Sequence, residues 1–268
     1  MSLQSFYSDK VVLITGASMG IGKELARQVL EAGGKAVITG RHESRLHTAQ
    51  TEFADYADQL LIHAGDVADH RDNQALVEKI IAHFGKLDVL INNAGVSCFG
   101  EVEALQEDVV RQVVDTNIYG SVFPVMAAIP ELKKTKGSIL FVSSVAGFHG
   151  LPGHSTYSLS KMALKALTQS LRTELHAHDV FAGIAYVGFT ENETDKRTIS
   201  PNGNPEPVPQ RPKRLVASRE VTAAKILNQI RNRKAEEIHG WLGKFTGVMS
   251  RFFPSLLHLL IRKNYKKQ

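Results

Sequence analysis

Short runs of β-branched and other apolar residues alternate with segments of helical length along most of this 268-residue chain. The runs are apolar along most of their length, as is typical of strands that are covered on both faces. Helical spacing between them, as in 21–32, 73–84 and 155–175, predicts parallel strands joined by right-handed crossovers. We therefore expect a doubly wound parallel α/β sheet. Its six predicted strands are Val11–Thr15, Ala36–Thr39, Gln59–His63, Leu87–Asn92, Ser138–Ser143 and Phe181–Val187.

Charge is distributed unevenly along the chain. Residues 211–268 hold 14 Lys or Arg and three Asp or Glu, whereas the first 210 residues hold 18 basic and 24 acidic residues. A mildly acidic body with a strongly basic end argues against a uniform nucleic-acid-binding surface. The basic end also contains no recognised nucleic-acid-binding module. We expect no nucleic-acid partner.

Cysteine and histidine usage limits the remaining possibilities. With Cys98 as the single cysteine, the chain forms no intrachain disulfide and no cysteine-based zinc cluster. His149, His154 and the other histidines show no closely spaced ligand set, so we expect no metal. The N-terminus lacks the apolar core of a signal peptide, and no stretch reaches the roughly 18 apolar residues of a membrane span. We expect a cytoplasmic protein.

A glycine-rich turn connects the first predicted strand to the first predicted helix. It reads Thr15-Gly16-Ala17-Ser18-Met19-Gly20-Ile21-Gly22. Glycines are needed where the backbone turns sharply and approaches a diphosphate, which then lies at the helix N-terminus. The spacing Gly-x-x-x-Gly-x-Gly differs from the usual dinucleotide fingerprint. A tight turn without a ligand is the alternative, but the strand and helix around it favour a dinucleotide site.

The end of the second strand distinguishes the two nicotinamide cofactors. An acidic residue there would hold the ribose 2′-hydroxyl and repel a 2′-phosphate. This chain has Thr39-Gly40-Arg41-His42 instead, and an arginine makes charge-assisted bonds to phosphate. Arg41 facing only water is the alternative. We predict NADP(H) as the cofactor.

Tyr157 and Lys161 stand four positions apart in a predicted helix and therefore on one helical face. A neighbouring cation favours the phenolate, so we expect a lowered tyrosine pKa that suits proton transfer. Ser144 lies just past the fifth strand, where its hydroxyl can hold a substrate carbonyl. An isolated Tyr-x-x-x-Lys is more often a surface pair, so the motif needs the others beside it.

Together these motifs resemble the short-chain dehydrogenase/reductase family over roughly residues 8–240, in the family's order. Further matches are Gly65-Asp66-Val67, Asn92-Asn93-Ala94-Gly95 and Asn117. The resemblance implies a Rossmann-like fold, with Tyr157 as general acid/base and Ser144 orienting the substrate oxygen. It further implies that Lys161 tunes the tyrosine and binds the nicotinamide ribose, and that Asn117 holds a water in a proton relay. Asp66 would contact the adenine. The cofactor-binding residues that follow are Gly16, Ser18, Met19, Gly20, Ile21, Gly22, Arg41, Asp66, Val67, Asn93, Ala94, Gly95, Tyr157, Lys161, Val187 and Thr190.

The chain departs from the family after the sixth strand. Val187-Gly188 stands where the family has Pro-Gly, and the proline-rich segment 190–214 follows. A long connection without secondary structure at this end of the sheet favours a substrate lid over a decorative surface insertion. We assign residues 1–240 to one catalytic domain, and we expect the homodimer or homotetramer that is common in the family.

The last segment, 241–268, has apolar residues at helical steps and ends in Arg262-Lys263-Asn264-Tyr265-Lys266-Lys267-Gln268. Pro254 should kink or divide this helix. A basic amphipathic helix suits peripheral contact with the inner face of an anionic membrane. Packing on its own domain or on a second subunit is the alternative. The tail resembles, loosely, those of 3-ketosphinganine reductases.

These features favour an NADPH-dependent oxidoreductase that interconverts a hydrophobic ketone and a secondary alcohol. A 3-oxoacyl-carrier-protein reductase is the alternative enzyme, because a basic surface also suits an acidic carrier protein. A catalytically silent NADP-binding scaffold is the alternative outside enzymes. The presence of Ser144, Tyr157 and Lys161 argues against it.

Overall fold

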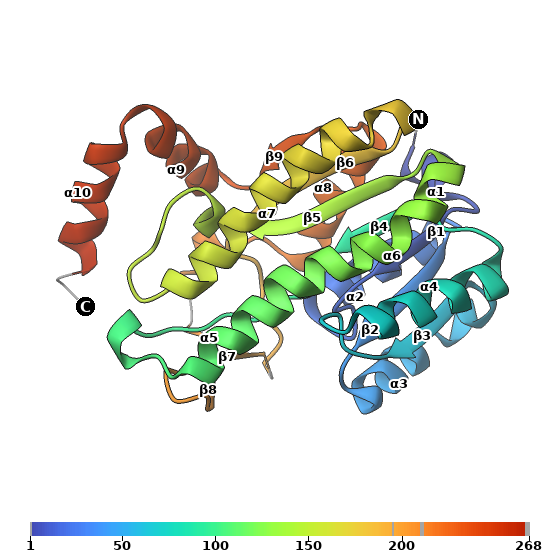
Figure 1. Ribbon diagram of the computed structural model, residues 1–268, viewed down its shortest axis with the longest axis horizontal. Helices are drawn as coiled ribbons and strands as arrows, with labels where there is room; N and C mark the ends of the chain where they lie inside the picture. Colours follow the sequence, from blue (N-terminus) through green and yellow to red (C-terminus); the bar gives the residue numbers. More distant parts are fainter. Residues whose placement is uncertain (1, 195, 210–211, 266–268) are drawn as a thin grey trace.

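The computed structural model describes residues 2–194, 196–209 and 212–265. Its core is a sheet of seven parallel strands in the order β3-β2-β1-β4-β5-β6-β9 (Figure 1). This confirms the predicted doubly wound sheet. The strands are β1 Val11–Ile14, β2 Lys35–Gly40, β3 Leu60–Ala64, β4 Val89–Asn92, β5 Ser138–Ser144, β6 Phe181–Val187 and β9 Glu236–Ile238.

Helices cover both faces of the sheet, as Figure 1 shows. Successive residues of β1 serve the two layers in turn, because side chains alternate across a strand. Val12 and Ile14 pack with α1, α2, α3 and α8, whereas Val11 and Leu13 pack with α4, α6 and α7. The helices are α1 Leu3–Tyr7, α2 Gly20–Glu31, α3 Glu43–Glu52, α4 His70–Phe84, α5 Glu107–Val114, α6 Gly120–Thr135, α7 Ser155–Glu174, α8 Arg219–Arg231, α9 Trp241–Phe252 and α10 Pro254–Tyr265.

The helix ends follow from local sequence, as α4 illustrates. The Asp69 side chain accepts hydrogen bonds from the backbone N–H groups of Arg71 and Asp72, which caps the helix start. Gly85 ends the helix in a left-handed conformation that glycine adopts without strain. Because the strands are parallel, their carboxyl ends lie at one edge of the sheet, and the motif residues gather there.

β9 was not among the six predicted strands. It spans three residues at the sheet edge, and two of them are the acidic Glu236 and Glu237. A short charged edge strand has no apolar run to mark it, because only its pairing with β6 makes it a strand.

Segment 190–214 differs from the expected connection without secondary structure. It contains an antiparallel hairpin of β7 Arg197–Ile199 and β8 Pro205–Pro207. The backbone of Ile199 also bonds to the loop after β4: its N–H donates to the Ser97 carbonyl at 2.8 Å, and its carbonyl accepts from Phe99 at 3.0 Å. Pairing within the hairpin and with the loop after β4 gives hydrogen-bond partners to backbone groups of this segment.

The tail forms two helices, α9 and α10, which confirms the division predicted at Pro254. Figure 1 shows them, in red, beyond the edge of the sheet at the end where the chain finishes. α9 packs on its own domain through Met249 and through Ser250, whose hydroxyl donates to the Phe148 carbonyl at 2.8 Å. The domain therefore holds one side of the tail.

Candidate active site

The glycine-rich turn is tied to the end of β4 by four hydrogen bonds. The Thr15 hydroxyl oxygen accepts from the N–H groups of Asn93 and Ala94, each at 3.0 Å. The Asn93 side-chain amide donates to the Thr15 and Gly16 carbonyls, also at 3.0 Å. Asn93 thus braces the turn through its side chain. Thr15 braces the turn as well, although its place in the motif did not reveal this role.

Glycine is required at two positions of this turn. A Cβ on Gly16 would lie 2.7 Å from the Ala94 Cα, and Gly16 has a φ of +61°. A Cβ on Gly22 would lie 2.6 Å from the Asn93 side-chain nitrogen. The turn therefore owes its shape to close backbone approach, as a dinucleotide-binding turn does.

The start of α2 is an anion-binding position. A Cβ on Gly20 would meet nothing within 4 Å, so this side of the turn is open. The Gly20 N–H donates to a carboxylate oxygen of Glu193 at 2.8 Å. An anion at a helix N-terminus is stabilised by the free N–H groups and the helix dipole. The predicted residues Ser18, Met19 and Ile21 belong to the same turn, so it fits the diphosphate of a dinucleotide.

The side chain of Arg45 and the backbone just before Arg41 approach the 18–19 turn. Arg41 is exposed and directly follows Gly40, where a Cβ would lie 3.2 Å from the Ser18 hydroxyl. The Arg45 guanidinium lies 3.5 Å from the Met19 sulfur. Arg45 was not among the predicted site residues, although a second arginine four residues after Arg41 is visible in the sequence.

Asp66 and Val67 follow β3 at the same edge. The exposed Asp66 carboxylate accepts from the Ala68 N–H at 2.9 Å, which fixes the turn. Val67 is buried against the start of α6, because a Cβ on Gly120 would lie 2.5 Å from it. The contact of these two residues with a cofactor stays a prediction.

The three catalytic candidates come together at the ends of β5 and α7. Ser144 ends β5 and is hydrogen-bonded through its side chain to Tyr157. Lys161 is buried on the same helix as Tyr157, with its ammonium 5.8 Å from the tyrosine ring centre. The ammonium donates to the Val142 carbonyl at 3.1 Å. Tyr157 and Lys161, which follow Ser144 by 13 and 17 residues along the chain, thus form one cluster with it.

Burial is the largest cause of the pKa shifts of Tyr157 and Lys161. It raises the pKa of Tyr157, and the hydrogen bond to Ser144 only partly offsets the rise. The expected lowering of the tyrosine pKa is therefore not met. Burial, with a smaller contribution from the charge of Lys196, lowers the pKa of Lys161 to about 8. Burial thus favours the neutral hydroxyl of Tyr157 over the phenolate.

Asn117 fastens the loop after β4 to α7. It lies in a π-helical turn, Asp115–Tyr119, and is fully buried. Its side-chain oxygen accepts from the Val96 N–H at 2.8 Å, and its nitrogen donates to the Val96 carbonyl and the Ser160 hydroxyl at 2.9 Å. π-Helical turns are frequent at functional sites. The water-holding role of Asn117 stays a prediction.

Gly95 lies close to both Asn117 and Lys161. A Cβ there would stand 3.2 Å from both the Asn117 oxygen and the Lys161 ammonium. The backbone therefore passes close to both groups, which places the loop after β4 against the catalytic cluster.

The segment after β6 reaches the same edge. Val187 is buried at the end of the strand, and the Thr190 hydroxyl lies 3.2 Å from that of Thr222. Thr190 lines a cavity of about 180 Å³ together with Val145, the residue after Ser144. The side chains that give this cavity its apolar character are Val145, Phe189, Leu215, Val216, Trp241 and Leu242.

Two features are absent from the part of the chain that the structure describes. Over residues 2–194, 196–209 and 212–265, no three His, Cys, Asp or Glu side chains gather as metal ligands. Within the same ranges, no helix has the length and apolar character needed to cross a bilayer.

A family model described as short chain dehydrogenase matches residues 10–202. The chain belongs to this family. It is 38% identical to 11-beta-hydroxysteroid dehydrogenase-like 4A of Arabidopsis thaliana over 187 residues, which are 68% of this chain and 62% of that protein. It is 40% identical to 11-beta-hydroxysteroid dehydrogenase 1A of the same plant, over 69% of this chain and 53% of that protein. The chain thus matches between about half and two thirds of the length of these curated relatives.

Solved structures of short-chain dehydrogenases share the fold. One from Streptomyces avermitilis superposes with a TM-score of 0.80, covers 97% of each chain and is 22% identical. An alcohol dehydrogenase from Thermococcus sibiricus, solved with 5-hydroxy-NADP, superposes with a TM-score of 0.76. It is 24% identical and covers 87% of this chain and 97% of its own.

Proposed function

We propose that this short-chain dehydrogenase is an NADPH-dependent oxidoreductase that interconverts a hydrophobic ketone and a secondary alcohol. The observation that carries the proposal is the cluster of Ser144, Tyr157 and Lys161 beside Gly95 and Asn117. It lies at the edge of the sheet that also holds the anion-binding start of α2. The names of relatives, hydroxysteroid and alcohol dehydrogenases, agree with an alcohol or ketone substrate.

The chemistry divides between cofactor and chain. NADPH, when bound, supplies the hydride. Tyr157 donates the proton to the substrate oxygen, since burial keeps its hydroxyl protonated. Ser144, already hydrogen-bonded to Tyr157, holds the same oxygen. Lys161 places a positive charge beside the cluster and binds the nicotinamide ribose.

Arg41 and Arg45 support the choice of NADPH over NADH. The Arg45 guanidinium contacts Met19 of the 18–19 turn, and Arg41 directly follows Gly40, which lies beside Ser18. The adenosine ribose of a dinucleotide would lie near this turn, and β2 ends without a carboxylate. A phosphate gains charge-assisted bonds from such groups, whereas a ribose hydroxyl gains little.

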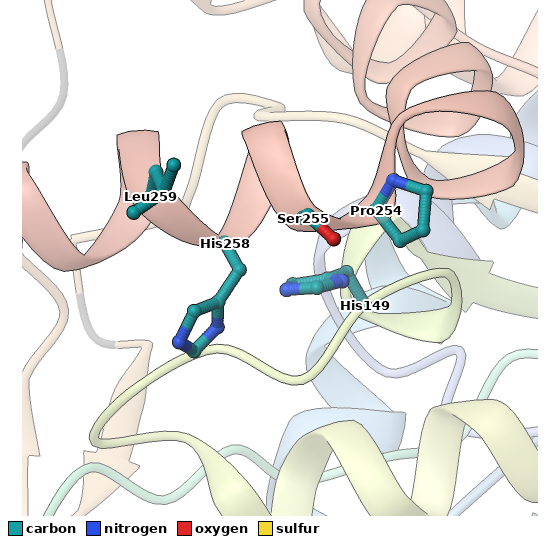
Figure 2. Close-up of a pocket in the computed structure, with 5 residues that line it drawn as sticks. All are labelled: His149, Pro254, Ser255, His258 and Leu259. Atoms are coloured by element: carbon teal, nitrogen blue, oxygen red, sulfur yellow. The ribbon is translucent and has the colours of Figure 1, made fainter.

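Apolar surroundings of the cluster support a hydrophobic substrate. The cavity behind Val145 is lined mostly by apolar side chains. A second hollow, of about 520 Å³, lies between α10 and the loop after β5. Figure 2 shows His149 reaching from that loop toward α10, and His258 pointing back toward the loop. A long apolar chain would fit along these surfaces, with its carbonyl at Tyr157.

The tail supports peripheral attachment of the cytoplasmic protein to an anionic membrane. α9 and α10 expose large apolar side chains although α9 packs on the domain by its other side. No acidic residue occurs in 241–268, and Lys244, Arg251, Arg262 and Lys263 accompany the apolar groups. This combination is typical of helices that lie in a lipid interface. The exposed apolar side chains are Trp241, Phe245, Val248, Phe252, Phe253, Leu256, Leu259 and Leu260.

Exposed apolar residues on α6 and α7 support the homodimer or homotetramer that is common in the family. Met126, Leu159 and Met162 are exposed on these helices, and Tyr119 lies just before α6. Light scattering coupled to gel filtration should give twice or four times the 29.5 kDa of one chain.

The activity is tested by NADPH consumption against a ketone panel. It should include a long-chain 3-oxo lipid in micelles and a carrier-linked 3-oxoacyl substrate. We expect turnover of the free lipid ketone with NADPH and much slower turnover with NADH. Turnover of the carrier-linked substrate alone would support the 3-oxoacyl-carrier-protein reductase instead. NADPH binding without turnover of any ketone would support the silent scaffold.

Membrane attachment is tested by flotation with vesicles that contain an anionic phospholipid. The double variant W241S and F252S removes two side chains that are each 65% exposed, so folding should be unaffected. We expect it to lose flotation, whereas V221S, a matched change on α8, should float like the unaltered protein. Unaltered protein that stays in the soluble fraction would contradict the proposal.

A further inference from the structure

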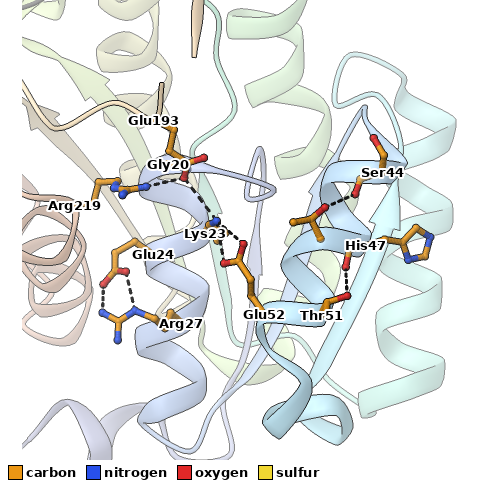
Figure 3. A network of polar contacts seen from close by, with 11 residues as sticks. Gly20, Lys23, Glu24, Arg27, Ser44, His47, Thr51, Glu52, Glu193 and Arg219 are labelled. Carbon is orange, nitrogen blue, oxygen red and sulfur yellow. Dashed lines mark hydrogen bonds and ion pairs between the residues drawn. The ribbon is translucent and has the colours of Figure 1, made fainter. Parts of the chain in front are cut away.

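Glu193 places a carboxylate at the start of α2. Its oxygen Oε1 accepts from the Gly20 N–H at 2.8 Å and from Arg219 Nη1 at 2.7 Å. The Lys23 ammonium lies 3.8 Å from the same oxygen. Figure 3 shows Glu193 descending from the segment after β6 toward these donors, which come from α2 and α8. One oxygen thus joins three separate parts of the chain.

This contact is more than a surface ion pair. The Glu193 side chain is only 19% exposed, and one of its donors is a backbone N–H at a helix N-terminus. Such an N–H binds any anion that reaches it, and the helix dipole adds to the attraction. Charge-assisted bonds of this kind are about twice as strong as neutral ones.

The same short segment also approaches the other end of the cofactor site. Lys196 lies near enough to the buried Lys161 ammonium to contribute to its lowered pKa.

We propose that Glu193 competes with the diphosphate of the cofactor for the start of α2, and that its displacement leaves Arg219 to the diphosphate. This inference rests on the proposed binding of NADP(H). A carboxylate and a phosphate cannot both accept the Gly20 N–H in line at 2.8 Å, so binding requires the Glu193 contact to break. The apparent association constant for NADPH then equals its intrinsic value multiplied by the fraction of molecules in which the contact is open.

The test compares NADPH dissociation constants, measured by the change in nicotinamide fluorescence on binding. E193Q keeps the size of the side chain and removes its charge. We expect the NADPH dissociation constant to fall by about five- to fifty-fold, the size of one or two charge-assisted bonds. E191Q makes the same charge change on the same segment, where the side chain is exposed, and should leave the constant within two-fold.

A smaller ligand shows whether the effect is local to the diphosphate. Adenosine 2′-monophosphate carries the 2′-phosphate but no 5′-phosphate. Measured by displacement of NADPH, its dissociation constant should be the same in E193Q and in the unaltered protein. An equal gain for both ligands would show a general change of the site and would overturn the competition.

A double-mutant cycle with Arg219 tests the second half of the proposal. In the unaltered protein R219Q weakens both the Glu193 contact and the diphosphate contact, so its net effect on NADPH should be under three-fold. In the E193Q background only the diphosphate contact remains, and R219Q should weaken NADPH by about three- to thirty-fold. Equal effects of R219Q in both backgrounds would overturn this role of Arg219.

Failure of this inference differs from failure of the proposed function. Tight NADPH binding that does not improve in E193Q overturns the competition and leaves the cofactor assignment intact. A chain that binds neither NADPH nor NADH, with or without the substitution, overturns both.

Discussion

The cofactor half of the molecule and its C-terminal part differ in how many of their side chains find contacts within the chain. Around β1 and β4, the polar groups of Thr15 and Asn93 find partners within the chain, and Thr15 is fully buried. In α9 and α10, by contrast, side chains such as Trp241 and Phe252 are 65% exposed. The glycine-rich turn of the first region is braced from within the chain, whereas the second region exposes apolar side chains of the kind that a partner covers.

This difference separates chemistry from specificity. The groups that would hold the cofactor and move the proton are fixed by strands and helices of the buried core. We call this region the fixed half. The groups that line the cavities proposed for the substrate lie on the loop after β5, the segment after β6 and the tail. A scaffold of this kind supports many substrates through changes in the second set alone.

The largest expected effect is that of Y157F on the fixed half. The change removes the one hydroxyl placed to donate the proton, so turnover should fall by about 10³-fold, within the range of general acid catalysis. NADPH binding should stay within two-fold, because the phenyl ring fills the same space. Steady-state turnover and fluorescence titration measure the two quantities. Near-normal turnover would remove Tyr157 from the mechanism and with it the contrast between the two regions.

The next largest effect is that of K161M on stability. Lys161 has its pKa lowered from 10.5 to about 8 by burial, so the folded chain carries an unfavourable charge below pH 8. Between pH 8 and about 10.4 the folded state releases this proton while the unfolded state keeps it, so this unfavourable contribution disappears as pH rises. Methionine removes the charge, and the variant should gain on the order of 2–3 kcal/mol at pH 7 while losing activity.

The gain from K161M should shrink toward zero at pH 10.5. Urea unfolding of the variant and the unaltered protein at both pH values measures it, and other groups that titrate in this range cancel in the comparison. A variant that is less stable at pH 7 would show that the hydrogen bond from Lys161 to the Val142 carbonyl outweighs the buried charge.

A smaller effect is expected for R41A, at the exposed margin of the fixed half. Loss of a charge-assisted bond to the 2′-phosphate should weaken NADPH by about 10- to 50-fold and NADH by less than three-fold. Titration of both cofactors gives the ratio, and R71A on α4 serves as a control arginine. Equal losses for the two cofactors would show that Arg41 does not contact the phosphate, and Arg45 would be the next arginine to test.

Much of the fixed half was predictable because its sequence signals arise from backbone geometry. Gly16 has a φ of +61°, which glycine adopts without strain, and buried strands are marked by short apolar runs. Tyr157 and Lys161 were predictable because helical spacing alone sets them on one face. Such constraints act over a few residues and are therefore visible in the sequence.

The rest depends on contacts between distant segments. Arg45 and Arg219 have no motif of their own, and Thr15 belongs to a motif that does not reveal its hydrogen bonds. The roles of all three follow from neighbours that only the fold supplies. The hairpin within 190–214 is set by pairing with the loop after β4, and proline-rich sequence hides it. The pKa of Tyr157 was misjudged for a similar reason, since its burial comes from several elements at once.

The smallest expected effect concerns the joint between the two regions. The Ser250 hydroxyl donates to the Phe148 carbonyl at 2.8 Å and so fastens α9 to the loop that follows the catalytic strand β5. S250A should weaken this docking by about 1 kcal/mol, the net value of one hydrogen bond. Hydrogen exchange of the amides in 241–265 should accelerate by about five-fold in the variant, while those of β1 and β4 keep their rates. S255A, at the first turn of α10, is the matched control. Faster exchange throughout the sheet would show that the tail unfolds together with the core. The distinction between an internally braced core and a separately docked tail would then be wrong.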